Sequence, residues 1–178
     1  QISGSTVDAV SALLPSFSPT REKLTGAGES LRGRAPLYAI NGIPQSTPVR
    51  DGSRDGYTID PFFIDRVEVI YGSNALQGIG ATGGVVNQVT VGAPQEDGVS
   101  FRTLSQVTVP TSFEGEGIGA KSGALVGYRA GPFDASVGAT YEKRGAFFDG
   151  NDDRIGVDGT QGDIQDSDSW SVFARLGY

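Results

Sequence analysis

The composition of this 178-residue chain excludes several classes of protein. It has no histidine and no cysteine, so it holds no disulfide, no thiolate metal site and no nucleophile that is activated by histidine. Its formal net charge is −7, and no basic face is visible for a nucleic-acid backbone. We therefore expect a protein that is not an enzyme, has no cofactor or metal and does not bind nucleic acid.

The sequence also limits how the chain can meet a membrane. No run of 18 apolar residues is present, so no transmembrane helix is predicted. Membrane strands give a much weaker signal and are not excluded by this absence. The chain starts at Gln1 without a signal peptide and contains no methionine. We expect it to be an excised segment, or a mature protein that lacks its beginning.

A short helix is predicted near the start of the chain. Residues 6–14 place apolar side chains on one helical face, and Pro15 ends the pattern. The threonine at its start can cap the first turn. The residues concerned are Thr6 for the cap and Val7, Val10, Leu13 and Leu14 for the apolar face.

Strands and turns dominate the next part of the sequence. Residues 37–44 predict a strand that runs into an Asn41-Gly42 turn. A long polar loop over residues 45–61 follows, and loops of this length are often functional. Residues 62–72 alternate in polarity and predict a strand, as do the β-branched residues 85–91. Between these two strands, Ser73 can cap a single helical turn.

The pattern changes at the linker-like residues 93–98, and we place a domain boundary between residues 97 and 98. Long alternating segments then predict antiparallel strands, separated near the end by an acidic loop. These predicted strands cover residues 99–109, 122–130, 133–143 and 169–178.

Aromatic residues mark both ends of the apolar faces of the last two predicted strands. Phe133 pairs in this way with Tyr141, and Trp170 with Tyr178, each eight positions apart. Eight residues rise roughly 26 Å, which at a tilt of ~40° covers about 20 Å of membrane depth. We therefore predict lipid-facing strands in which these four aromatics form membrane girdles.

Periodicity alone leaves a second interpretation open, because a soluble antiparallel sandwich alternates in the same way. Four strands also cannot close a barrel, which needs at least about eight. We expect the barrel in this segment to be incomplete, or its strands to pair with other strands.

The stretch from Gly78 to Gly83 matches the G-x-G-x-x-G pattern of dinucleotide sites. That site needs a helix that opens on the glycines, so that backbone N–H groups meet the pyrophosphate. Residues 85–91 instead predict a strand. A soluble nucleotide-dependent protein is the alternative interpretation of these glycines, and it would require a helix after residue 83.

Residues 64–90, IDRVEVIYGSNALQGIGATGGVVNQVT, closely resemble the plug-domain signature of TonB-dependent receptors. LRG at 31–33 resembles the family's I-R-G, and LYAINGIP at 37–44 resembles its L-x-[VL]-[DN]-G-[VI]-P. The motif glycines are Gly33, Gly42, Gly72, Gly78, Gly83 and Gly84.

This resemblance implies an α+β plug domain, a small mixed sheet with short helices, followed by antiparallel strands of an incomplete transmembrane β-barrel. Residues 1–97 would be the plug without its N-terminal part, and residues 98–178 the first barrel strands. It implies a location in the bacterial outer membrane, in contact with its lipid. The TonB box would precede this segment.

The resemblance also implies active uptake of a scarce nutrient, and the chain is most like the siderophore receptors. Its partners would be a ferric siderophore and TonB, acting with ExbB and ExbD. Carbohydrate, peptide or cobalamin uptake is an alternative, as is a surface β-rich binding module without a transport role.

Two groups of site residues follow from the resemblance. Arg32 and Arg66 match motif arginines that face barrel glutamates in the family, and with Glu68 they are expected to form a plug–barrel electrostatic latch. The long loop would face the extracellular vestibule, where Arg50, Arg54 and Tyr57 are candidate contacts for an anionic ferric chelate.

The acidic run at 149–169 raises the question of a calcium site. It fails the EF-hand pattern, because Arg154 stands where that loop needs glycine and Thr160 where it needs glutamate. We expect a solvated extracellular loop there instead.

Overall fold

The structure, a computed structural model, describes residues 6–19, 29–45, 55–72, 81–111, 115–155, 157–158, 162–163 and 167–178. The chain forms two compact units, Gln1–Val91 and Gly92–Tyr178. Within the described ranges, no helix has the length and hydropathy needed to cross a membrane.

The first unit is built on a small mixed sheet. Its strand order is β4-β3-β6-β5, with β3 parallel to β6 and the other pairs antiparallel. A separate pair, β1 with β2, is antiparallel. The elements are α1 (Thr6–Leu13), β1 (Phe17–Ser18), β2 (Ser30–Leu31), β3 (Leu37–Ile40), β4 (Ile43–Pro44), η1 (Asp55–Tyr57), η2 (Pro61–Phe63), β5 (Ile64–Tyr71) and β6 (Gly84–Thr90).

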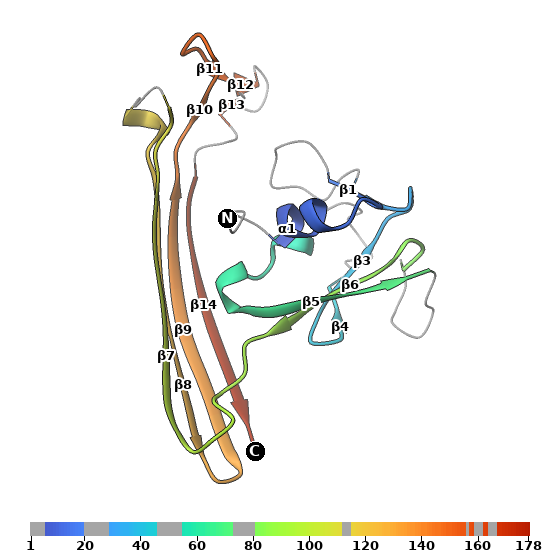
Figure 1. Ribbon diagram of the computed structural model, residues 1–178, viewed down its shortest axis with the longest axis vertical. Coiled ribbons are helices and arrows are strands. Elements are labelled where there is room, and N and C mark those ends of the chain that lie inside the picture. The colour runs from blue at the N-terminus through green and yellow to red at the C-terminus, as the bar shows by residue number, and fades with distance from the viewer. Residues whose placement is uncertain are drawn as a thin grey trace. The chain divides into compact units, whose positions relative to one another are not determined.

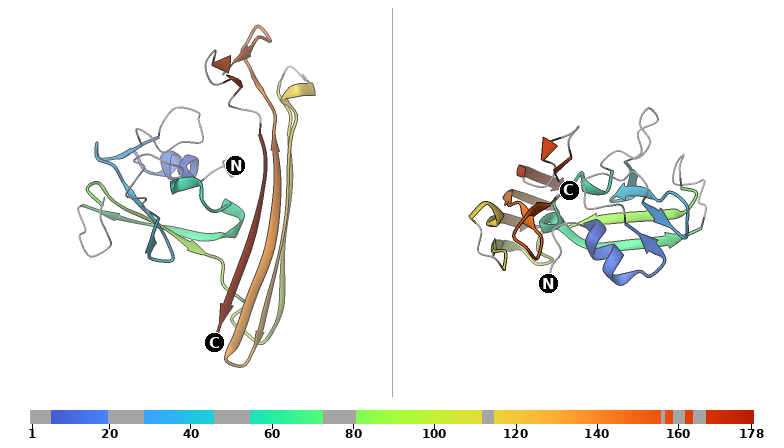
Figure 2. Two further views of the ribbon diagram at one scale, coloured as in Figure 1. Left: turned by 180° about the vertical axis from the view of Figure 1, so that it is seen from behind. Right: turned by 90° about the horizontal axis from the view of Figure 1, so that it is seen from above.

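Helix α1 lies over one face of this sheet (Figure 2). Val7 and Val10 are buried there against Val86. Leu13, by contrast, is 78% exposed. The prediction that it lies on the buried face of the helix is wrong. Leu13 follows Val7 by six positions and so lies about 120° around the helix from it.

The helix begins one residue earlier than the predicted cap requires. Thr6 is the first helical residue, and its hydroxyl is buried without a hydrogen-bond partner among the described residues. The prediction that Thr6 caps the helix is therefore wrong, since a capping side chain accepts from an N–H of the first turn.

The hairpin between β3 and β4 confirms the predicted Asn41-Gly42 turn. Asn41 and Gly42 have φ angles of 50° and 80°, and Ile40 pairs with Ile43 across the turn. Two left-handed residues in a two-residue loop match the twist of the flanking strands, and this is why Asn-Gly is favoured there.

Strand β6 follows directly after Gly83, where a dinucleotide site would need a helix. Its residues 84–90 pair with β3 on one side and β5 on the other. The helix on which the nucleotide alternative depends is absent from residues 84–90, and this alternative is overturned.

The second unit is a four-stranded antiparallel sheet of order β14-β9-β8-β7. Its long strands run side by side (Figure 1). They are β7 (Gly98–Thr108), β8 (Gly119–Ala130), β9 (Phe133–Arg144) and β14 (Ser167–Gly177), with a short helix η4 (Gly115–Gly117) between β7 and β8.

The stretch between β9 and β14 contains short strand pairs, where the sequence predicted a loop. β10 pairs with β11 and β12 pairs with β13, both antiparallel. Their bounds are Phe147–Phe148, Arg154–Ile155, Val157–Asp158 and Gly162–Asp163. Pairs this short have weak alternation, which is why periodicity did not predict them.

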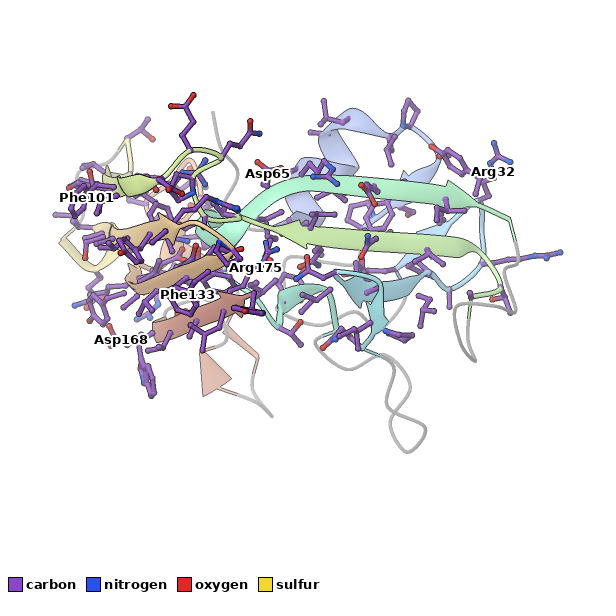
Figure 3. The ribbon with its side chains drawn as sticks, turned by 90° about the horizontal axis from the view of Figure 1, so that it is seen from below. Arg32, Asp65, Phe101, Phe133, Asp168 and Arg175 are labelled. Atoms are coloured by element: carbon purple, nitrogen blue, oxygen red, sulfur yellow. The ribbon has the colours of Figure 1, made fainter. Side chains whose placement is uncertain are left out.

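The four long strands present two chemically different faces. On one face, cross-strand neighbours form the row Phe101, Val126, Val137, Ala174. The other face carries ion pairs such as Lys121 with Glu142 at 3.1 Å. Phe101 and Phe133 lie on one side of the sheet and Arg175 on the other (Figure 3).

Candidate functional site

The LRGR motif forms a tight turn that displays Arg32. Leu31 N donates to Arg34 O at 2.8 Å, and Arg34 N donates back to Leu31 O at 3.3 Å. Arg32 and Gly33, between them, have φ angles of 55° and 75°. Arginine in this left-handed conformation costs about 1 kcal/mol, and such strain persists mainly at functional positions.

The Arg32 side chain is held over an aromatic ring. Its guanidinium carbon is 4.5 Å from the centroid of the Tyr71 ring. An exposed cation–π contact of this kind contributes about 0.5–1 kcal/mol and offsets part of the backbone strain. Tyr71 is a site residue that sequence reasoning missed, because nothing local links residue 71 to residue 32.

Arg66 and Glu68 project side by side from one face of β5 and form an ion pair. Arg66 Nε donates to Glu68 Oε1 at 2.9 Å, and Arg66 Nη1 lies 3.2 Å from Asp65 Oδ2. Both side chains of the Arg66–Glu68 pair are largely exposed. Among the described residues, two of the five N–H groups of this guanidinium have acceptors, so others can reach a further acceptor.

Asn87 extends this ion pair across the sheet. Its Nδ2 donates to Glu68 Oε2 at 3.0 Å, and its Oδ1 accepts from Gly42 N at 2.8 Å. Glu68 and Asn87 are direct partners in the β5–β6 register. Asn87 thereby connects the Asn-Gly turn to Arg66. Asn87 is the asparagine of the GGVVN motif, and its place in that motif is the one feature of the sequence from which this role could have been predicted.

The turn itself is tied to the end of β6 by Asn41. Asn41 Oδ1 accepts from Thr90 N at 2.9 Å, and Asn41 Nδ2 donates to Thr90 Oγ1 at 2.8 Å. A left-handed asparagine can thus satisfy both the turn and a neighbouring strand. These contacts hold Gly42 in position to donate to Asn87.

These contacts favour the charged forms of both side chains of the ion pair. Hydrogen bonds from Asn87 first, and then from Arg66, hold the pKa of Glu68 below its ordinary value. Bonds to Glu68 and then to Asp65 raise the pKa of Arg66. A carboxyl group with a lowered pKa stabilises the fold above its unfolded pKa, and this contribution is lost as the pH falls through the folded pKa.

The three predicted latch residues do not lie together. Arg32 stacks on Tyr71 near the end of β5, whereas Asp65, next to Arg66, lies near its beginning (Figure 3). Tyr71 also alternates with Arg66 and Glu68 and so faces the other side of the strand. The structure shows one arginine on each side of β5.

Several motif glycines stand where a side chain would not fit or where φ is positive. A Cβ on Gly83 would lie 2.5 Å from Arg34 O and 2.9 Å from Leu31 O, so only glycine lets this backbone pass the LRGR turn. Gly33, Gly42, Gly72 and Gly84 all have positive φ. Gly78 lies outside the described residues.

Residues 46–54 of the candidate ligand loop lie outside the described residues, and Arg50 and Arg54 are among them. Tyr57 belongs to η1, is half-buried and packs against the core cluster that contains α1 residues. Part of this side chain therefore serves the fold.

The four candidate girdle aromatics belong to β9 and β14 or directly follow β14. Tyr141 is paired with Trp170, and the strand positions of Phe133 and Tyr178 place them toward the other end of the same face. All four are exposed, Trp170 by 77% and Tyr178 fully. Between them lie Val137, Val172 and Leu176, also exposed.

The acidic stretch shows no ligand set in its described part. Asp149 Oδ1 accepts from Asn151 N at 2.8 Å and from Asp153 N at 3.0 Å, so this carboxylate closes its own turn. Among the residues that the structure describes, no group of three or more acidic side chains is arranged to hold a metal ion.

Comparison with known proteins agrees with this architecture. Residues 1–85 match the model of the TonB-dependent Receptor Plug Domain. The FrpB iron transporter from Neisseria meningitidis (F3-3 variant) has the same fold over 99% of this chain and 26% of its own, with a TM-score of 0.69 at 19% identity. The predicted fold, a plug domain followed by antiparallel strands that do not close a barrel within this chain, is confirmed.

Two curated relatives are similar across both units. The ferric aerobactin receptor of Klebsiella pneumoniae is 34% identical over 167 residues, and the rhizobactin receptor of Rhizobium meliloti (strain 1021) is 32% identical over 168. Each match covers 93% of this chain and 22% of the relative, so the chain spans about a fifth of their length. The chain belongs to the TonB-dependent receptors of the outer membrane, and its residues 1–85 match their plug domain.

Proposed function

We propose that this chain is part of a receptor that imports a ferric siderophore across the outer membrane, with energy delivered through TonB. The observation that carries this proposal is the similarity to the aerobactin and rhizobactin receptors, which extends over 93% of the chain. It therefore includes the strands as well as the plug residues 1–85. The work is transport, and no catalytic step is needed for it.

The polar face of the plug sheet supports this proposal. It carries the Arg66–Glu68–Asn87 network rather than a continuous apolar surface. Polar contacts of this kind can be broken and remade against water at a small net change in free energy, since each is worth about 1 kcal/mol. A plug held by such contacts can be displaced by a pull and can return.

Uptake of radioactive iron tests the proposal. Cells that lack their own siderophore receptors and carry the full-length gene should accumulate iron from ferric aerobactin, and inactivation of TonB should abolish accumulation without abolishing binding at the cell surface. Cells with an empty vector are the control. Uptake of cobalamin, a carbohydrate or a peptide without any iron uptake would contradict the ligand class, and binding without transport would indicate a surface module.

We further propose that Arg32 and Arg66, the latter oriented by Glu68, hold the plug to carboxylates of the barrel wall outside this chain. The strained backbone of Arg32 supports this role, because a glycine or asparagine would fit the turn without strain. The network around Arg66 supports it too, since Glu68 and Asp65 orient the guanidinium. The two arginines then act as two separate contacts, one on each side of β5.

Replacement of Arg32 by asparagine tests this latch while preserving its turn. Asparagine accepts the left-handed conformation, so the receptor should accumulate to normal levels. The substitution removes the guanidinium of Arg32. We expect ferric siderophore binding to persist, and the rate of TonB-dependent uptake to change at least about threefold, which corresponds to the loss of one exposed ion pair. Arg34→Asn removes an equal charge from the same turn and should leave uptake unchanged. Equal uptake by wild type and Arg32→Asn would exclude the latch role of Arg32.

Two further assignments are proposed. Arg50, Arg54 and the exposed part of Tyr57 would contact the anionic chelate, because arginine pairs with anions and tyrosine offers an amphipathic surface. The four aromatics Phe133, Tyr141, Trp170 and Tyr178 would lie at the two membrane interfaces. Their exposure on one face supports this placement, since such rings favour the interface.

A further inference from the structure

The short connection between the two units is fastened to the strands. Residues 92–97 belong to the second unit, although the sequence change at 93–98 indicated a linker-like break. Pro94 and Asp97 each bond to the β8–β9 hairpin. Residues 92–97 are therefore bound to the strands of the second unit by hydrogen bonds.

Arg129 makes the shorter of these two contacts. Its Nε donates to the carbonyl oxygen of Pro94 at 2.6 Å, and its Nη2 lies 3.4 Å from Asp134 Oδ2. The Arg129 and Asp134 side chains are both mostly shielded, with 30% and 16% exposed. Asp134, on the neighbouring strand β9, orients the guanidinium, and a charged donor strengthens the bond to the carbonyl.

Asp97 supplies a second attachment three residues after Pro94. Its Oδ1 accepts from Gly131 N at 2.9 Å, in the turn between β8 and β9. Gly127 leaves room for the segment, because a Cβ there would lie 3.0 Å from Pro94 Cδ. The hydrogen bonds of the Arg129 and Asp97 side chains thus hold residues 94–97 to the β8–β9 hairpin, and Gly127 lets Pro94 lie close to it.

We propose that Arg129, assisted by Asp97, is a positioning residue that clamps residues 92–97 to the β8–β9 hairpin and so fixes the C-terminal attachment of the plug. The consequence for import rests on the proposed function: a pull on the plug is resisted at Pro94 rather than transmitted into the strands. The contacts of the clamp all lie within residues 94–134.

Thiol labelling in the assembled full-length receptor tests the clamp. The chain has no cysteine, and Ala93 is half-buried, so Ala93→Cys places a reporter within the held segment. Removal of the guanidinium by Arg129→Ala should raise the maleimide labelling rate about tenfold, as expected when a charge-assisted hydrogen bond is lost. The matched control is Arg144→Ala, which removes an equally exposed arginine that also pairs with a carboxylate on the same sheet face.

A second pair of variants separates the clamp from a general loss of structure. Asp97→Asn keeps an oxygen acceptor for Gly131 N and should label at the wild-type rate, whereas Asp97→Ala should label several-fold faster. Equal rates in wild type, Arg129→Ala and Asp97→Ala would overturn the proposal, and so would equal acceleration by Arg144→Ala. These rates are measured without siderophore, so the clamp and the proposed ligand can fail independently.

Discussion

Replacement of Val137 by arginine is expected to prevent the full-length receptor from assembling in the outer membrane. Val137 lies midway between Phe133 and Tyr141 on β9 and is 54% exposed. Its cross-strand partners Val126 and Ala174 share that apolar face. An arginine near the middle of a lipid-facing strand costs about 2–4 kcal/mol, because its charge must be carried into hydrocarbon.

The measurement is the amount of folded receptor in isolated outer membranes, with resistance to urea extraction as a second readout. Ser171→Arg is the matched control, since Ser171 pairs with Thr140 on the polar face that already carries Arg175. It should assemble as wild type does. If both variants assembled equally, the apolar face would not be the lipid-facing one.

The second large effect is expected at Gly84. Its φ is +131°, and a Cβ there would collide with the carbonyl oxygen of Ile70 and lie 2.9 Å from Leu31 Cδ2. The carbonyl group of Ile70 belongs to the backbone of the neighbouring strand β5 and cannot rotate away. Strands β5 and β6 must therefore move apart at this point. We expect Gly84→Ala to destabilise the plug by about 3 kcal/mol or more, the sum of the backbone strain and the overpacking.

Protease sensitivity of residues 1–91 in the assembled receptor, followed in increasing urea, measures this loss. Two other glycines make a graded series. Gly72→Ala meets no atom within 4 Å but has a φ of +92°, so it should lose only about 1 kcal/mol. Gly115→Ala lies in the second unit, with open space and no positive φ, and serves as the control in which the stability of residues 1–91 should change by less than about 0.5 kcal/mol. Similar sensitivity in all three would show that the close approach at Gly84 does not matter.

Local patterns in the sequence predicted most of the strands and one turn. The alternation of apolar and polar residues in 133–143 and 169–178 is a property of each strand alone, because successive side chains point to opposite faces. Asn41-Gly42 was likewise predicted by two residues that tolerate left-handed angles. The plug was predicted from the resemblance of residues 64–90 to the family signature, and the structure gives a reason for one of its glycines, because a Cβ on Gly83 would lie 2.5 Å from Arg34 O.

Features that depend on long-range pairing could not be predicted in this way. Helix α1 was predicted, yet the exposure of Leu13 depends on which side of the helix meets the sheet. The latch residues looked equivalent in the sequence, but Arg32 stacks on Tyr71 whereas Arg66 pairs with Glu68. The sequence indicated a linker-like break at 93–98, but it did not show that Arg129 holds Pro94.

The sequence by itself therefore determined most of the longer elements, the two faces of the last two long strands and, through its resemblance, the family. The tertiary structure decided which distant groups meet: Asn87 with Glu68, Arg32 with Tyr71 and Arg129 with Pro94. The physical reason is one of range. Side-chain direction follows from the backbone period of a single strand, whereas a hydrogen bond between strands depends on their register, and no local stretch of sequence contains both partners.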